Sequence, residues 1–146
     1  MTPAPGLRTF RIVLLEDNDA DIYLLRRALK MAGLHIELTV LKDGAEGLAF
    51  ARRQGEPTSS PLPDLVVLDL NLPKGGGASV LRALRQNAVL ARTPVVVMSS
   101  SATPSEQAVI SELGVARYLT KPPDLAAFMK LGQVFGEVLR EGIPPR

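Results

Sequence analysis

The sequence has no cysteine and no tryptophan, and its aromatic residues are four phenylalanines and two tyrosines. The lack of cysteine excludes disulfide bonds and thiolate metal ligands, and it is typical of proteins in the cytosol. No apolar run approaches the roughly 20 residues that cross a bilayer, and the N-terminus lacks the apolar core of a signal peptide. We therefore expect a cytoplasmic protein with no membrane partner.

Charge of one sign is also scarce, since 17 lysines and arginines face 15 acidic residues, for a net charge of +2. The basic residues are scattered and alternate with apolar residues at helical spacing, which is typical of solvated helix faces. With so few aromatic side chains, a platform for stacking nucleic-acid bases would be thin. We expect no nucleic-acid partner.

Five short apolar runs predict strands, and amphipathic segments between them predict helices. The runs at 12–15, 65–68 and 95–98 are continuous and mostly β-branched, which favours strands buried on both faces of a parallel sheet. The runs at 38–41 and 116–119 are weaker. Because strand and helix alternate five times, the sequence predicts a doubly wound α/β fold in one domain.

Several residues predict where helices begin and end. Gly33 is a stop for the first helix, and residues 103–106 read Thr-Pro-Ser-Glu, which predicts an N-cap with a capping box. Asp124 is the expected N-cap of one long last helix that ends near Gly142. The expected divisions are a flexible tail at 1–9, the domain at 10–142 and a second tail at 143–146.

Polar residues follow four of the five predicted strands. Glu16 and Asp17 follow the first, Asp69 the third, Ser99 the fourth and Lys121 the fifth. Ligands of doubly wound sheets bind outside the carboxyl ends of the strands. We therefore expect these five side chains to meet at one rim of the sheet.

Carboxylates that converge in this way repel one another unless a cation lies between them. Oxygen ligands without cysteine favour Mg²⁺ or Mn²⁺ over zinc. A carboxylate that stays partly free, such as Asp69, can attack phosphorus and form an aspartyl phosphate. The cation, the Lys121 ammonium and the Ser99 hydroxyl would then neutralise or bind the phosphoryl oxygens.

Each of these features alone has a simpler interpretation. Asp17, Asn18 or Asp19 could cap a helix, and Lys121-Pro122 could form a turn. The glycines at 75–77 suggest a phosphate-binding loop, but no GxxxxGK pattern follows them. Only the coincidence of polar groups at successive strand ends favours a phosphoryl site.

Four motifs, in this order and spacing, resemble the receiver domain of two-component response regulators. They are Leu14–Asn18, Pro63–Pro73, Pro94–Ser101 and Tyr118–Pro122. The resemblance extends from about residue 10 to about residue 140. It implies a five-stranded parallel sheet in a flavodoxin-like (βα)5 receiver fold.

The resemblance implies a role for each residue at the rim. Asp69 is the phosphoacceptor and a ligand of Mg²⁺ or Mn²⁺. Asp17 binds the cation directly, Glu16 binds it through water, and Asn71 binds it through its backbone carbonyl. Asn71 also lies at a position that tunes the lifetime of the acyl phosphate in this family.

Further roles follow from the same resemblance. Ser99, Ser100 and Lys121 bind the phosphoryl group, and Tyr118 is the switch aromatic that turns inward when Ser99 moves. The Lys121–Pro122 peptide is expected to be cis, as is common in receivers. The third helix is expected to begin loosely, because Gly75 and Gly76 replace the usual cap.

The implied function is signalling rather than enzymatic turnover. A receiver takes its phosphoryl group from a sensor histidine kinase, and its own chemistry is limited to self-phosphorylation and self-dephosphorylation. We expect a stand-alone regulator, because no DNA-binding region follows the last helix. Its signalling surface, and the interface of a homodimer, would be the face of the fourth helix, fifth strand and fifth helix. The Glu-Asp-Asn and Leu-Asn-Leu-Pro runs resemble regulators of bacterial phytochrome kinases.

Two other functions stay open. A phosphatase of the haloacid dehalogenase type also uses an aspartyl nucleophile, but it carries an acid two residues later, where this sequence has Asn71. A vestigial receiver could act as a scaffold, although Asp17, Asp69, Ser99 and Lys121 are all present. Labelling of Asp69 by a small phosphodonor separates these readings.

Overall fold

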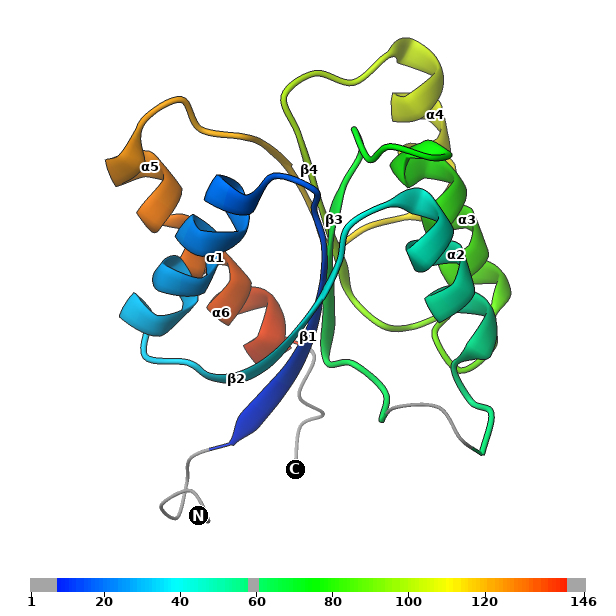
Figure 1. Ribbon diagram of the computed structural model, residues 1–146, viewed down its shortest axis with the longest axis horizontal. Helices are drawn as coiled ribbons and strands as arrows, with labels where there is room; N and C mark the ends of the chain where they lie inside the picture. Colours follow the sequence, from blue (N-terminus) through cyan, green and yellow to red (C-terminus); the bar gives the residue numbers. More distant parts are fainter. Residues whose placement is uncertain (1–7, 58–60, 142–146) are drawn as a thin grey trace.

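Five strands form one parallel sheet, and helices cover both of its faces in the computed structural model, which describes residues 8–57 and 61–141 (Figure 1). The strand order β2-β1-β3-β4-β5 is the flavodoxin-like order, so the predicted doubly wound fold is confirmed. In chain order, the elements are β1 (Thr9–Leu15), α1 (Asp19–Met31), β2 (His35–Leu41), α2 (Gly44–Arg53), β3 (Leu65–Asp69), α3 (Gly76–Gln86), β4 (Val95–Ser99), α4 (Pro104–Leu113), β5 (Arg117–Thr120), α5 (Leu125–Met129) and α6 (Leu131–Glu141).

The central strands are buried on both faces, as their apolar runs predict. Every residue of β3 and β4 is buried, whereas burial alternates along the edge strands β2 and β5. The register pairs Leu15 with Leu68, Asp69 with Met98, and Ser99 with Thr120. The carboxyl ends of four strands therefore reach the same rim of the sheet.

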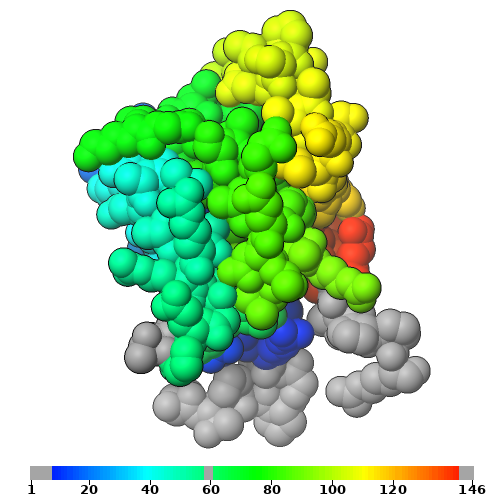
Figure 2. Space-filling view, turned by 90° about the vertical axis from the view of Figure 1, so that its right-hand side faces the viewer, coloured from blue at the N-terminus to red at the C-terminus, as the bar shows by residue number. Residues whose placement is uncertain are grey.

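Two layers of helices enclose the sheet, with α1, α5 and α6 on one face and α2, α3 and α4 on the other (Figure 1). Alternate strand residues serve the two layers: Ile12 and Leu14 pack in the cluster with Phe135, while Val13 and Leu15 pack in the cluster with Val80. Figure 2 shows α2 and α3 side by side on the second face. Burial of these apolar faces fixes the sheet and hence the rim.

The first turn of α1 begins close to the rim, and its cap decides among the alternatives left open by the sequence. Asn18 is the N-cap, because its side-chain oxygen accepts a hydrogen bond from the Asp21 backbone N–H at 3.0 Å. At the other end, Gly33 has a φ of 77° and stops the helix as predicted. The capping box of Thr103 and Glu106 is also present.

The prediction of one long last helix is wrong. The helix is interrupted at Lys130, which separates α5 from α6. At this point the Lys130 N–H donates to the Ala127 carbonyl at 3.2 Å, three residues back, in a tighter turn than that of an α-helix. At Gly132 an added Cβ would lie 2.1 Å from the Ala28 carbonyl oxygen, so α6 starts against the backbone of α1. The predicted end near Gly142 lies outside the described residues.

The structure describes only part of the two tails that the sequence predicts at 1–9 and 143–146. Of the predicted N-terminal tail, the structure describes residues 8 and 9, and Thr9 already begins β1. The predicted tail at 143–146 lies outside the described residues. No helix among the residues that the structure describes is long and apolar enough to cross a membrane.

Candidate functional site

The ends of β1, β3 and β5 bring three ionisable side chains into direct contact. The Lys121 Nζ atom donates to Glu16 Oε1 at 2.6 Å and to Asp69 Oδ2 at 3.1 Å. These residues are far apart in the sequence, and only the parallel register of the strands joins them. The polar rim expected from the sequence is therefore a compact ionic site.

Three carboxylates at this rim are arranged as cation ligands. One oxygen from each of Glu16, Asp17 and Asp69 lies within 4.8 Å of the others. Glu16 and Asp69 are buried, while Asp17 is exposed and leaves one side open to water or phosphate. The buried Glu16 Oε2 has no hydrogen-bond partner among the described residues, which suits a contact through the hydration shell of a cation. The donor set fits Mg²⁺ or Mn²⁺.

Lys121 has a third carboxylate partner that the sequence did not predict. Its ammonium donates to Asp21 Oδ2 at 2.8 Å, so all three N–H groups have acceptors. Asp21 comes from α1 and lies three residues after the N-cap Asn18. The available signal was an acidic residue in the first turn of a helix at the rim, but such residues are usually explained by the helix dipole alone.

Burial and neighbouring charges shift the pKa of each buried group. Burial raises the pKa of Glu16 to about 9, hydrogen bonding to Asp69 and Asp21 adds to the shift, and Lys121 opposes it. For Asp69, burial acts to raise the pKa, but the hydrogen bonds with Glu16 and the Asn71 N–H outweigh burial and lower it. Asp69 is therefore the ionised carboxylate of the buried pair, which is the form that a nucleophile requires.

Burial and hydrogen bonding also act in opposite directions on the pKa of Lys121. Burial acts to lower the pKa of Lys121, but hydrogen bonds to Asp21 and Glu16 outweigh burial and raise it. The ammonium therefore stays charged at neutral pH beside the ionised Asp69.

The backbone around Asp69 is held by close packing with the start of α3. The Asn71 N–H donates to Asp69 Oδ1 at 2.9 Å, which orients the carboxylate. An added Cβ at Gly77 would lie 2.6 Å from the Asp69 carbonyl oxygen and 2.7 Å from Leu70 Cα. Gly75, the N-cap of α3, has a φ of 114° and no side-chain cap, in agreement with the loose start that was predicted. Glycine at 77 permits the helix to approach the site.

Ser99 is buried at the end of β4, but its hydroxyl bonds within its own loop. It donates to the Ser101 carbonyl at 2.6 Å and lies 3.3 Å from Asn71 Oδ1. Ser100 is exposed and lines a pocket next to Lys121. Tyr118 on β5 is 40% exposed, so its ring lies outward in this structure. Within the part of the chain that the structure describes, neither Ser99 nor Tyr118 makes a hydrogen bond with Asp69.

One expectation about the backbone is wrong. No cis peptide bond occurs in the described chain, so the Lys121–Pro122 bond is trans. The trans isomer is the lower in energy for most X–Pro bonds by a modest margin.

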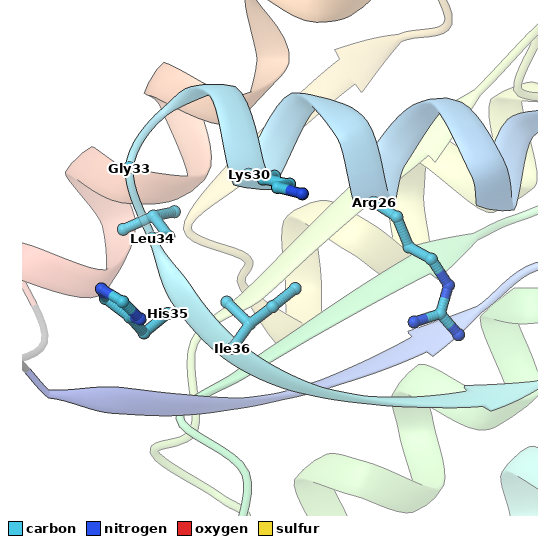
Figure 3. Close-up of a pocket in the computed structure, with 6 residues that line it drawn as sticks. All are labelled: Arg26, Lys30, Gly33, Leu34, His35 and Ile36. Atoms are coloured by element: carbon cyan, nitrogen blue, oxygen red, sulfur yellow. The ribbon is translucent and has the colours of Figure 1, made fainter. Parts of the chain in front are cut away.

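A second charged region lies at the amino end of β2, far from the strand ends that form the rim. Figure 3 shows Arg26 and Lys30 on α1 and His35 at the start of β2, around a pocket of about 440 Å³. These three side chains are exposed, and none makes a hydrogen bond or ion pair with another residue of the described ranges. No acidic residue lines this pocket.

Comparisons with known proteins match most of this chain to one family. The family model described as response regulator receiver domain matches residues 12–131. The response regulator Rcp1 of Synechocystis sp. is 43% identical over 122 residues, which cover 84% of this chain and 83% of that protein.

Solved structures give the same result. The phosphorylated cyanobacterial phytochrome response regulator RcpA has a TM-score of 0.81 at 34% identity, over 94% of this chain and 98% of that chain. The Mn²⁺-bound form of Rcp1 has a TM-score of 0.79 at 39% identity, over 94% and 99% of the two chains. The bacteriophytochrome response regulator RtBRR has a TM-score of 0.72 at 32% identity, over 95% and 81%.

Proposed function

Since the chain belongs to the response regulator receiver domain family, we propose that Asp69 accepts a phosphoryl group from a sensor histidine kinase with the help of Mg²⁺ or Mn²⁺. The observation that carries this proposal is the contact of Lys121 with Glu16 and Asp69 beside the carboxylate of Asp17. Receivers are signal transducers rather than enzymes with an external substrate, and we extend that role to this chain.

The proposed chemistry is a direct transfer to Asp69. A bond forms between a carboxylate oxygen and phosphorus, while the bond from phosphorus to the donor nitrogen breaks and its electron pair leaves on that nitrogen. The Asn71 N–H orients the carboxylate, and the Lys121 ammonium donates to a phosphoryl oxygen. A bound cation adds positive charge at the same oxygens. It would be held by Asp17 and Asp69, by Glu16 through water, and by the Asn71 backbone carbonyl.

The output is a change of surface that starts at Ser99. Its hydroxyl leaves the Ser101 carbonyl for a phosphoryl oxygen, with Ser100 beside it, and Tyr118 turns inward from its exposed position. The surface that changes is the face of α4, β5 and the last helices α5 and α6. We propose that this face binds a second copy of the chain, to form a homodimer, or another protein, and that it binds no nucleic acid.

The receiver domain comprises residues 10–142, acts in the cytoplasm, and carries out only its own phosphorylation and dephosphorylation. The kinase is proposed to be a bacterial phytochrome, because RcpA is a cyanobacterial phytochrome response regulator and RtBRR is a bacteriophytochrome response regulator. Transfer from other kinases, with none from a phytochrome kinase, would contradict this choice of donor.

The central experiment is labelling by a small phosphodonor. Protein is incubated with Mg²⁺ and acetyl phosphate, and intact mass is expected to show one added phosphoryl group that Asp69→Ala lacks. Asp19→Asn is the matched control, because Asp19 is an exposed acid of α1 that pairs with Lys42. Equal labelling of Asp69→Ala would overturn the proposal, and repeated turnover of external phosphomonoesters would favour the phosphatase.

A further inference from the structure

The Lys121 ammonium is held by carboxylates from three separate elements, and Asp21 is the partner whose role is unexplained. The three distances from Nζ are 2.6 Å to Glu16, 2.8 Å to Asp21 and 3.1 Å to Asp69. The Lys121 side chain is only 16% exposed. Its position is therefore set by these three contacts rather than by solvent.

Asp21 differs from Glu16 and Asp69, the other two partners of Lys121, because it has no role in binding the cation or in capping a helix. The group of carboxylates close enough to share a cation consists of Glu16, Asp17 and Asp69, and Asp21 lies outside it. Asp21 does not cap its helix either, since Asn18 does so and the Asp21 backbone N–H donates to that cap. The Asp21 carboxylate is therefore the one partner of Lys121 that neither binds the cation nor receives the phosphoryl group.

The space beside Lys121 explains why such a partner is needed. A pocket of about 420 Å³ borders Lys121 and Asp21, and it is otherwise lined by residues of the Ser100 loop, the Pro122–Leu125 segment and Phe128. No packed side chain fills this space, so the long lysine side chain has room to move away from Asp69. The hydrogen bond to Asp21 is the contact that restrains the ammonium on the pocket side.

We propose that Asp21 is a positioning residue that holds the Lys121 ammonium in line with the phosphoryl group on Asp69. This inference rests on the proposed function of Asp69. When a cation engages Glu16 and the phosphoryl group occupies Asp69, the bond to Asp21 persists and keeps the ammonium within reach. A misplacement of about 1 Å in a reacting site costs up to about 100-fold in rate. We expect loss of Asp21 to cost about 10-fold, because the cation remains in place.

The test compares Asp21→Ala, Asp21→Asn and Asp19→Asn with the natural protein. The rate of labelling by acetyl phosphate at saturating Mg²⁺ is followed by intact mass, and circular dichroism checks the fold. We expect Asp21→Ala to be about 10-fold slower, Asp21→Asn to lie between, because its amide oxygen still accepts, and Asp19→Asn to be unchanged. The Asp19→Asn variant removes the same charge from the same helical turn, but the Asp19 carboxylate pairs with Lys42 rather than with Lys121.

The sign of the change separates positioning from simple charge. Removing a negative charge near the site weakens repulsion of an anionic phosphodonor and would accelerate labelling. Faster or unchanged labelling of both Asp21 variants would overturn the inference, as would equal rates for Asp21→Asn and Asp21→Ala. In each of these cases labelling of Asp69 would still support the proposed function, whereas no labelling of the natural protein would remove both.

Discussion

Two charged regions of this chain lie at opposite ends of the sheet, and they are built in different ways. At the rim, four segments each contribute one residue, and the Lys121 ammonium contacts the carboxylates of Glu16, Asp21 and Asp69 at 2.6 to 3.1 Å. In the pocket of Figure 3, the basic side chains come from α1 and from the start of β2, and they are exposed.

The difference shows which charges need an explanation. An exposed charge is hydrated and costs little, so a basic pocket requires no function to account for it. A buried charge has lost its hydration, so it requires charged or hydrogen-bonding partners in place of water. Substituting apolar residues for a buried ionic cluster often stabilises a protein. The rim keeps its buried charges although they reduce stability, which is the expected pattern for a functional site.

The largest expected effect comes from removing the Lys121 ammonium from the rim. Lys121→Met leaves three carboxylates without their shared partner, so we expect the free energy of unfolding in EDTA to fall by about 3 kcal/mol. Urea denaturation followed by circular dichroism measures the change. The matched variant Arg26→Met removes an exposed cation of the same α1–β2 pocket and should change stability by less than about 0.5 kcal/mol. Equal losses in the two variants would remove the distinction between the regions.

The same distinction explains how much of the site could be predicted. Glu16, Asp69 and Lys121 were predictable because each lies at the end of a strand or directly after it, and parallel strands end at one rim. Asp21 was not, because its contact with Lys121 depends on how α1 lies against the end of β5. Helical periodicity reports the face of a helix and not its distance from another element.

The fold divides in the same way. The buried strands β3 and β4 were evident from continuous β-branched runs, which have few other interpretations. The break at Lys130 was not, because the apolar spacing of Phe128, Leu131 and Phe135 continues across it. Just after the break, Gly132 packs closely against the Ala28 carbonyl, which is a tertiary contact that the spacing of apolar residues does not report.

An intermediate effect is expected at two glycines, one in each region. Gly77→Ala would place a Cβ 2.6 Å from the Asp69 carbonyl oxygen, so the backbone of the site must shift. We expect a loss of about 2 kcal/mol in stability and slower labelling of Asp69. Gly33 in the basic pocket has open space around its Cβ position but a φ of 77°. Gly33→Ala should cost about 1 kcal/mol of backbone strain with unchanged labelling, and slower labelling there would contradict the comparison.

The smallest effect is the response to Mg²⁺, which should belong to the rim alone. A cation at ten times its dissociation constant stabilises the folded state by about 1.4 kcal/mol. We expect this gain in Asp19→Asn and its loss in Asp17→Asn, because only Asp17 belongs to the cluster of ligand atoms. Thermal unfolding with Mg²⁺ and with EDTA measures both, and an equal response of the two variants would place the cation elsewhere.

The pH dependence of that response follows from Glu16. Its pKa of about 9 in the cation-free protein lies above the ordinary value of 4.5, so the folded state holds a proton that the unfolded state releases. Through Glu16, stability in EDTA therefore falls as pH rises from about 4.5 toward about 9. A cation must displace this proton, so Mg²⁺ should bind more tightly as pH rises through the same range, with proton release measurable by calorimetry in two buffers. Glu16→Gln removes the proton and should release none, and persistent release from that variant would assign the coupling to another group.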